Sequence, residues 1–137
     1  AGAGTLMLLN GLRGAVVGAR VGARSAGRLV VVVDDSKLGP KVGGETAWPV
    51  ESAAFGWPST IARLQAYRPV LRRTGGVPFT TDGGNHIADC AVDTIADARK
   101  LEAELHALPG VIETGLFIAM TSTVIVAGSN GVEEFAP

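Results

Sequence analysis

The amino-acid sequence predicts an α/β fold in which a smaller α+β lobe is inserted into a larger sheet. Three observations support this prediction. Five consecutive aliphatic residues at 29–33 are typical of a strand that is buried on both faces. A second apolar strand returns at Val124–Val126, and strand and helix signals alternate along the chain between the two.

The composition is that of a folded protein without a nucleic-acid or membrane surface. Of the 137 residues, 47% are hydrophobic and 18% charged, with a net charge of −1, so a core is expected and no basic block attracts nucleic acid. No apolar run is long enough for a membrane span. The single cysteine, Cys90, excludes an internal disulfide and a cysteine-built metal site. A start without Met suggests a processed or truncated N-terminus in a soluble protein of the cytoplasm or an organelle.

In the first portion of the chain, the residue pattern predicts a strand, then a helix, then a second strand. Thr5–Leu9 is a short apolar strand, and residues 11–27 favour a helix that its glycines weaken. Small residues at 14, 18 and 22 share one helix face, which is expected to pack closely on the sheet. Arg20 and Arg24 are one turn apart and are expected to be solvated. The strand at 29–33 follows.

The middle of the chain has the order β-α-β-β-α-β. This order is the ferredoxin-like pattern. The clearest helix spans 97–108, where Leu101, Leu105 and Leu108 share one face. The predicted strands are 50–55, 70–74, 86–92 and 111–117, and the other helix follows Pro58.

These elements predict a division into two domains. Residues 1–47 and 118–137 would form a partial Rossmann-like domain, and residues 48–117 the inserted ferredoxin-like lobe. The first and last portions are expected to pair in one sheet. Such a short sheet exposes an edge and apolar faces, so protein partners are expected to cover it.

Polar residues follow the strand at 29–33 and form the main candidate site: Asp34, Asp35, Ser36 and Lys37. In α/β sheets, ligands bind beyond the carboxyl ends of the strands. Two interpretations of Lys37 stay open. It is either a cation that pairs with a phosphate or with a substrate hydroxyl, or a loop lysine with a nearby acidic partner. Asp34 and Asp35 are adjacent, so they are not expected to act as a close carboxylate pair.

Other polar residues are interpreted as structural. The segment 82–85 is expected to form a hairpin-type turn. His86 and His106 lie on different predicted elements and are interpreted as packed or exposed histidines. Cys90 is expected to be a buried structural thiol. Neither a metal nor a cofactor is expected.

Five stretches, in order, resemble type A ribose-5-phosphate isomerase. They are RLVVVVDDSKL (28–38), PVESAAFGWPSTIARL (49–64), LRRTGGVPFTTDGGNHIADC (71–90), LEAELHALPGVIETGLF (101–117) and VIVAGSNGVE (124–133). The resemblance implies a Rossmann-like large domain and a ferredoxin-like small domain. It also implies the metal-independent interconversion of ribose 5-phosphate and ribulose 5-phosphate through an enediolate.

The same resemblance implies site residues, and the chain departs from several of them. Asp34, Ser36 and Lys37 match the family's Asp-x-Ser-Lys motif. The lysine before the family's glycine-rich stretch is Asn10 here, and the position of the catalytic glutamate holds Ala19. No counterpart of the family's N-terminal half is expected in this sequence.

These departures predict a catalytically inactive, isomerase-like domain that serves as a structural or accessory subunit of a larger assembly. One alternative is a portion of an active ribose-5-phosphate isomerase. Another is a phosphosugar-binding module in which Lys37 acts with backbone donors of the loop from Gly11 to Gly14.

Overall fold

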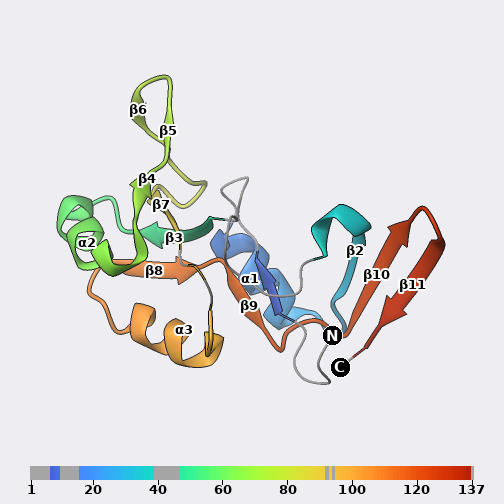
Figure 1. Ribbon diagram of the computed structural model, residues 1–137. Coiled ribbons are helices and arrows are strands. Elements are labelled where there is room, and N and C mark those ends of the chain that lie inside the picture. Colours follow the sequence, from blue (N-terminus) through green and yellow to red (C-terminus); the bar gives the residue numbers. More distant parts are fainter. Residues whose placement is uncertain (1–6, 10–15, 39–46, 92, 94, 137) are drawn as a thin grey trace.

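The computed structural model describes residues 7–9, 16–38, 47–91, 93 and 95–136, which form two main sheets with a helix between them (Figure 1). A four-stranded sheet with helices α2 and α3 lies to one side, and a three-stranded sheet to the other. Within these residues, no helix is long and apolar enough to cross a membrane. The predicted α/β class with an α+β lobe is confirmed.

The four-stranded sheet has the ferredoxin-like topology that the sequence predicts. Its strands are antiparallel and lie in the order β4-β7-β3-β8. In this order, β4 and β8, the strands that follow the two helices, lie at the edges of the sheet. The β-α-β-β-α-β sequence therefore forms one four-stranded layer. The strands are β3 (Trp48–Ser52), β4 (Val70–Leu71), β7 (His86–Cys90) and β8 (Val111–Thr114). The helices are α2 (Trp57–Arg63), the short 3-10 turn η2 (Gln65–Tyr67) and α3 (Ala98–His106).

The core of this lobe lies between the sheet and its helices. Val50 from β3 and Leu105 from α3 are fully buried. Helix α3 turns its apolar stripe inward, as its spacing predicts, and the Asp97 side chain caps it by accepting the backbone N–H of Lys100 at 3.0 Å. Each buried leucine contributes about 1.5–3 kcal/mol of hydrophobic stabilisation.

The strand predicted at 70–74 is in fact broken. Arg72 lies between β4 and β5 (Arg73–Thr74): its N–H still donates to the carbonyl of Ile87 on β7 at 2.8 Å, whereas its carbonyl accepts the N–H of Phe79 at 2.8 Å. Strand β5 then pairs with β6 (Val77–Pro78) in a hairpin that extends beyond the sheet (Figure 1). Gly75 and Gly76 have φ values of 60° and 82°, which suit glycine in a tight hairpin turn.

The three-stranded sheet joins the two ends of the chain, as predicted. It has the order β11-β10-β2, in which β2 (Val30–Asp34) runs parallel to β10 (Thr123–Gly128). Strand β11 (Gly131–Phe135) returns antiparallel to β10. The 3-10 turn η1 (Asp35–Lys37) follows β2 directly.

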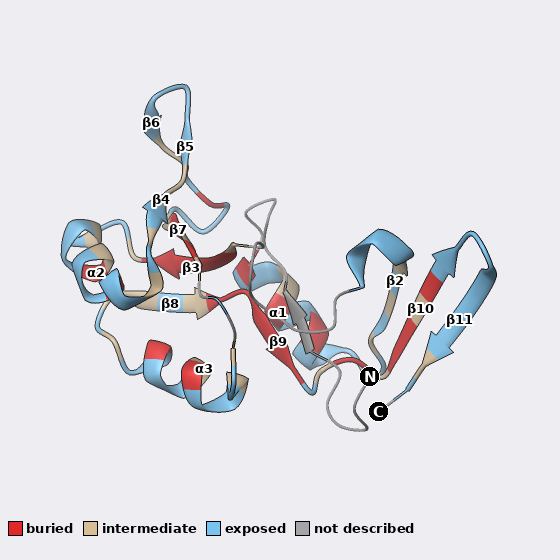
Figure 2. Ribbon diagram, viewed as in Figure 1, coloured by how far each residue is buried: buried red, intermediate tan, exposed pale blue. Residues whose placement is uncertain are grey.

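The expectation that β2 is buried on both faces is wrong. The register places Val31 and Val33 beside the buried Val124 and Val126, so this face is covered. The opposite face carries Val30, Val32 and, across the sheet, Val132. Val32 is 69% and Val132 72% exposed, and β2 is mostly pale in Figure 2. Strand β2 is also at the edge of this sheet, so nothing in the described chain pairs with its outer side.

Helix α1 (Val16–Ser25) packs by a face other than the predicted one. Gly18 and Gly22 are exposed, and a Cβ at either would meet no atom within 4 Å, whereas Gly14 lies outside the described residues. The buried stripe is instead Val16, Arg20 and Ala23. The face of α1 that packs on the rest of the protein therefore carries the large side chain of Arg20, not the glycines that were expected there.

The strand predicted at 111–117 is split between two sheets. Strand β8 belongs to the ferredoxin-like sheet, whereas β9 (Leu116–Ile118) pairs antiparallel with β1 (Met7–Leu9). Gly115 lies between them and donates its backbone N–H to the carbonyl of Pro49 at 2.8 Å.

Candidate functional site

The main site predicted from the sequence, Asp34–Lys37, lies at the carboxyl end of β2 and is called the rim below. A local hydrogen-bond network holds it in place. Asp34 ends the strand, and its Oδ1 accepts the backbone N–H of Ser36 at 3.0 Å as well as the Ser36 hydroxyl. The donated Ser36 hydroxyl is the main reason that the pKa of Asp34 is lowered. Asp34 therefore caps η1 and positions the residues that follow it.

Lys37 ends η1 as an exposed cation. It makes no direct ion pair within the described part of the chain, although its charge also helps to lower the pKa of Asp34. Asp35 lies beside Gly128 of β10: a Cβ at Gly128 would lie 2.9 Å from Asp35 Oδ2, so the carboxylate would have to shift. Asp34 and Asp35 thus have different surroundings, in keeping with the prediction that they do not act as a pair.

The rest of the predicted site is described only at Ala19. This residue lies on α1, and its methyl side chain cannot carry a proton. Asn10, Gly11 and Gly14 lie outside the described residues. The structure therefore places Asp34–Lys37 at the end of β2, and the predicted site stays a prediction in both halves.

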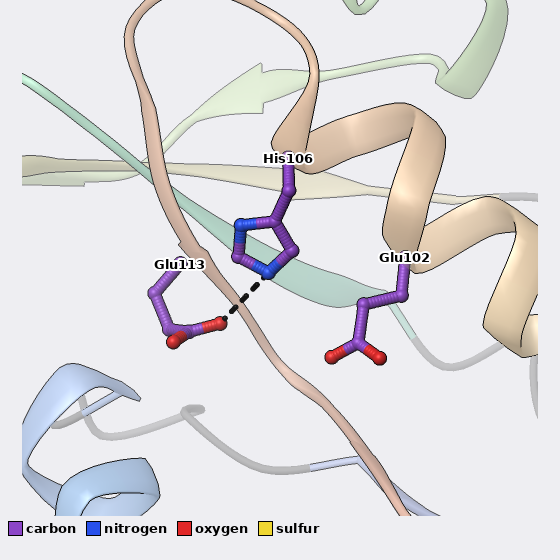
Figure 3. Close-up of side chains that lie close together, drawn as sticks. All are labelled: Glu102, His106 and Glu113. Atoms are coloured by element: carbon purple, nitrogen blue, oxygen red, sulfur yellow. Dashed lines mark ion pairs between the residues drawn. The ribbon is translucent and has the colours of Figure 1, made fainter.

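A second polar cluster was missed by sequence reasoning (Figure 3). Glu102 and His106 are one turn apart on α3, and Glu113 faces them from β8. One ligand-type atom of each residue lies within 4.8 Å of the others, and His106 Nε2 is 3.3 Å from Glu113 Oε1. Two carboxylates and an imidazole are a donor set that could hold a divalent metal.

The guanidinium of Arg20 already balances the negative charges of the two glutamates in this cluster. Its Nη1 is 2.6 Å from Glu102 Oε1, and its Nε is 2.8 Å from Glu113 Oε1. Its Nη2 donates to the carbonyl of Leu116 at 2.5 Å. A guanidinium between the two carboxylates would repel a second cation, so we interpret the cluster as an ion-pair network that fastens α1 to the lobe.

The expectation that Arg20 is solvated is therefore wrong, whereas Arg24 is exposed as expected. Arginine is rarely buried, which is why the sequence suggested solvent. Arg20 shares one helical stripe with Val16 and Ala23, and this spacing was the signal that could have indicated its burial.

Glu51 is a buried acid that the sequence did not single out. It lies on β3 and is 1% exposed; its Oε1 accepts the hydroxyl of Thr81 at 2.8 Å and the amide of Asn85 at 3.0 Å. Its Oε2 has no hydrogen-bond partner in the described structure. The predicted turn at 82–85 is confirmed, and it serves to close this loop over the carboxylate.

The remaining predicted residues are structural. His86 Nδ1 lies 3.0 Å from the carbonyl of Phe79, and the ring meets Trp57 edge-on. Cys90 is fully buried in the lobe core, and burial raises the pKa of its thiol to about 12. Such a thiol is unreactive at neutral pH.

Comparison with known proteins gives the family directly. The sequence model described as "Ribose 5-phosphate isomerase A (phosphoriboisomerase A)" matches residues 3–131. The chain belongs to the ribose-5-phosphate isomerase A family. The ribose-5-phosphate isomerase A of Gloeobacter violaceus is 41% identical over 136 residues, which are 98% of this chain and 59% of that relative.

Solved structures of ribose-5-phosphate isomerases share the fold. The enzyme from Plasmodium falciparum superposes with a TM-score of 0.90 at 27% identity, over 96% of this chain and 60% of that one. A further ribose-5-phosphate isomerase, solved in complex with phospho-erythronic acid, has a TM-score of 0.88 at 31% identity, over 96% of this chain and 59% of that one. The chain thus spans about 60% of the length of these relatives.

Proposed function

We propose that this chain is a portion of a ribose-5-phosphate isomerase that interconverts ribose 5-phosphate and ribulose 5-phosphate. The observation that carries the proposal is the family match over residues 3–131, within which Asp34, Ser36 and Lys37 form a rim at the end of β2. A relative bound to phospho-erythronic acid supports a phosphorylated sugar as the substrate class.

Lys37 would supply the electrostatic part of the chemistry. The reaction moves a proton between neighbouring carbons through an enediolate, so negative charge develops on a former carbonyl oxygen. An exposed ammonium at a strand end stabilises such charge, or holds the phosphate, without a metal. The Asp34 cap would keep η1, and with it Lys37, in place.

The proton-transfer group is not among the described residues that match the family motif. Ala19 cannot act as a base. Because the family's base position lies within this chain and holds Ala19, another acid must take over the proton transfer. We infer that this acid and the remaining phosphate donors come from polypeptide corresponding to the two-fifths of the relatives that this chain does not span.

That polypeptide would dock on β2. The free edge of β2 offers unpaired backbone groups for a further strand, and Val30, Val32 and Val132 offer an apolar face beside it. A protein segment that adds a strand to this edge and covers this face would also reach the rim at Asp34–Lys37. The domain boundaries expected from the sequence, with the lobe at 48–117, fit this proposal.

Reconstitution tests the proposal. The chain is mixed with the unmatched segment of the Gloeobacter violaceus relative, and ketose formation from ribose 5-phosphate is followed in the presence of a chelator. We expect turnover only in the mixture, with an about 100-fold loss for Lys37→Ala. Lys100→Ala removes an exposed lysine on α3 and is the matched control. Binding of the segment should fail for Val32→Lys but not for Val77→Lys on the hairpin.

A second candidate is the inactive structural or accessory subunit, which is favoured by Ala19 at the position that the family resemblance gives to the catalytic glutamate. The comparisons support the isomerase better, because the matching relatives carry that enzyme's name. Ala19→Glu separates the two. If the mixture turns over substrate only with this substitution, the native chain is a subunit without catalysis, and the isomerase proposal is wrong.

A further inference from the structure

An open groove lies away from the rim at Lys37, between the end of α1, the start of α3 and the chain that leaves β9. Its volume is about 420 Å³, within the range of small-molecule sites. Two arginines, Arg24 from α1 and Arg99 from α3, line it. Its other lining residues are Ala23, Ile118, Ala119 and Met120.

These two arginines differ from all the other arginines that the structure describes. Each of the others has a hydrogen-bond or ion-pair partner: Arg20, Arg28, Arg63, Arg68, Arg72 and Arg73. Arg24 and Arg99 have none within the described chain, and both lie on the same groove.

None of the described residues that line the groove is an acid. Of the acids on or beside α3, Glu102 is paired with Arg20, Glu104 lies 3.9 Å from Lys100, and Asp97 caps the helix by accepting the N–H of Lys100. The described groove therefore carries two guanidinium groups and no compensating carboxylate, in a chain whose net charge is −1. Uncompensated like charges on one groove repel each other, and an anion between them removes that cost.

We propose that this groove binds a small molecule that carries a phosphate group. Guanidinium groups match phosphate oxygens in charge and in paired hydrogen-bond geometry. Ala23 and Ile118 are each less than 10% exposed, and they give the groove an apolar side for the body of the ligand. Two cations on a groove of this size suit a small anion rather than a nucleic acid, which needs a longer basic track.

The site is separate from the proposed isomerase rim. It uses α1, α3 and β9, whereas the rim is built on β2 and η1. Its occupation would be a second binding event on the same chain, so it does not depend on whether the chain catalyses isomerisation.

Calorimetric titration at low ionic strength tests this proposal on the full chain. The probes are inorganic phosphate, ribose 5-phosphate and uncharged ribose. We expect both phosphates to bind and ribose not to bind. Arg24→Ala and Arg99→Ala should each weaken binding about tenfold, as expected for loss of a hydrogen bond to a charged group.

Three controls make the result decisive. Arg73→Ala removes an exposed arginine on the β5–β6 hairpin and should bind as the native chain does. Lys37→Ala removes the cation of the rim, so phosphate binding that persists in this variant and is lost in the groove variants belongs to the groove. Unchanged thermal unfolding of both groove variants shows that they fold. The proposal is overturned if neither phosphate binds, or if the Arg24→Ala, Arg99→Ala double variant binds phosphate as tightly as the native chain.

Discussion

Arg20 and Glu102, 82 residues apart in the sequence, form an ion pair of 2.6 Å that joins helix α1 to helix α3. The same guanidinium reaches Glu113 on β8 and lies 5.1 Å from the ring centroid of Phe117. One side chain thus connects α1 to the elements on either side of the β8–β9 junction. Since the Arg20 side chain is 7% exposed, these ion pairs are shielded from solvent.

Replacing Arg20 by methionine should therefore lower the free energy of unfolding by about 3 kcal/mol. Methionine keeps much of the packing but removes the guanidinium from two partly buried carboxylates, those of Glu102 and Glu113, and, among the described residues, leaves only His106 paired with Glu113. Urea unfolding measures the loss. Arg63→Met is the matched control, because Arg63 is exposed and bonds only within its own helix, and it should change stability by less than about 0.5 kcal/mol. Equal effects of both substitutions would show that the network does not hold α1.

Glu51 should tolerate glutamine far better than alanine. Its Oε1 accepts both hydrogen bonds, which the carbonyl oxygen of glutamine can also accept, and Oε2 has no partner to lose in the described structure. We expect Glu51→Gln to alter the unfolding free energy by less than about 1 kcal/mol. Glu51→Ala should cost about 2–4 kcal/mol, since the buried Thr81 hydroxyl and the Asn85 amide lose their acceptor. A glutamine variant as unstable as the alanine variant would indicate that the negative charge itself is required.

Cys90 makes the protein sensitive to alkaline pH. Burial raises the pKa of its thiol from 9.0 to about 12, so above pH 9 the unfolded chain releases a proton that the folded chain retains. The stabilising contribution is complete below pH 9 and is lost as the pH rises towards about 12. The expected slope from this group is about 1.4 kcal/mol per pH unit.

Urea unfolding at several pH values between 8 and 11, on the native chain and on Cys90→Ala, isolates this contribution. The variant removes the thiol and leaves Tyr67, whose pKa burial also raises, in both proteins. The native chain should lose stability more steeply than the variant. Parallel curves, or rapid modification of Cys90 by a thiol reagent in the folded state, would contradict a buried neutral thiol.

Gly110 should not accept alanine. Its φ is 92°, and a Cβ there would lie 2.1 Å from Thr60 Oγ1, so both the backbone and the neighbour oppose a side chain. We expect Gly110→Ala to cost more than about 2 kcal/mol in thermal or urea unfolding. Gly76→Ala separates the two causes, since its φ is 82° with open space around it, and it should cost only about 1 kcal/mol. Similar losses at both positions would mean that Thr60 moves aside.

Local patterns predicted much of this fold correctly. The leucine spacing of α3 and the returning apolar strand at 124–126 both follow from residues close together in sequence. The Asp34–Lys37 rim was found in the same way, as polar residues directly after an apolar strand. The two-domain division stays a prediction.

The sequence by itself determined the order of helices and strands, because periodicity and turn residues act within a few residues of one another. It determined the family through the similarity of whole stretches to known relatives. Only the tertiary structure decided which side chains are buried. Arg20 is covered because acids and carbonyls far along the chain converge on it, and Val32 is exposed because nothing described packs over its face of β2. Burial depends on what lies across an interface, and a local pattern indicates at most which face of an element is covered, not which partners cover it.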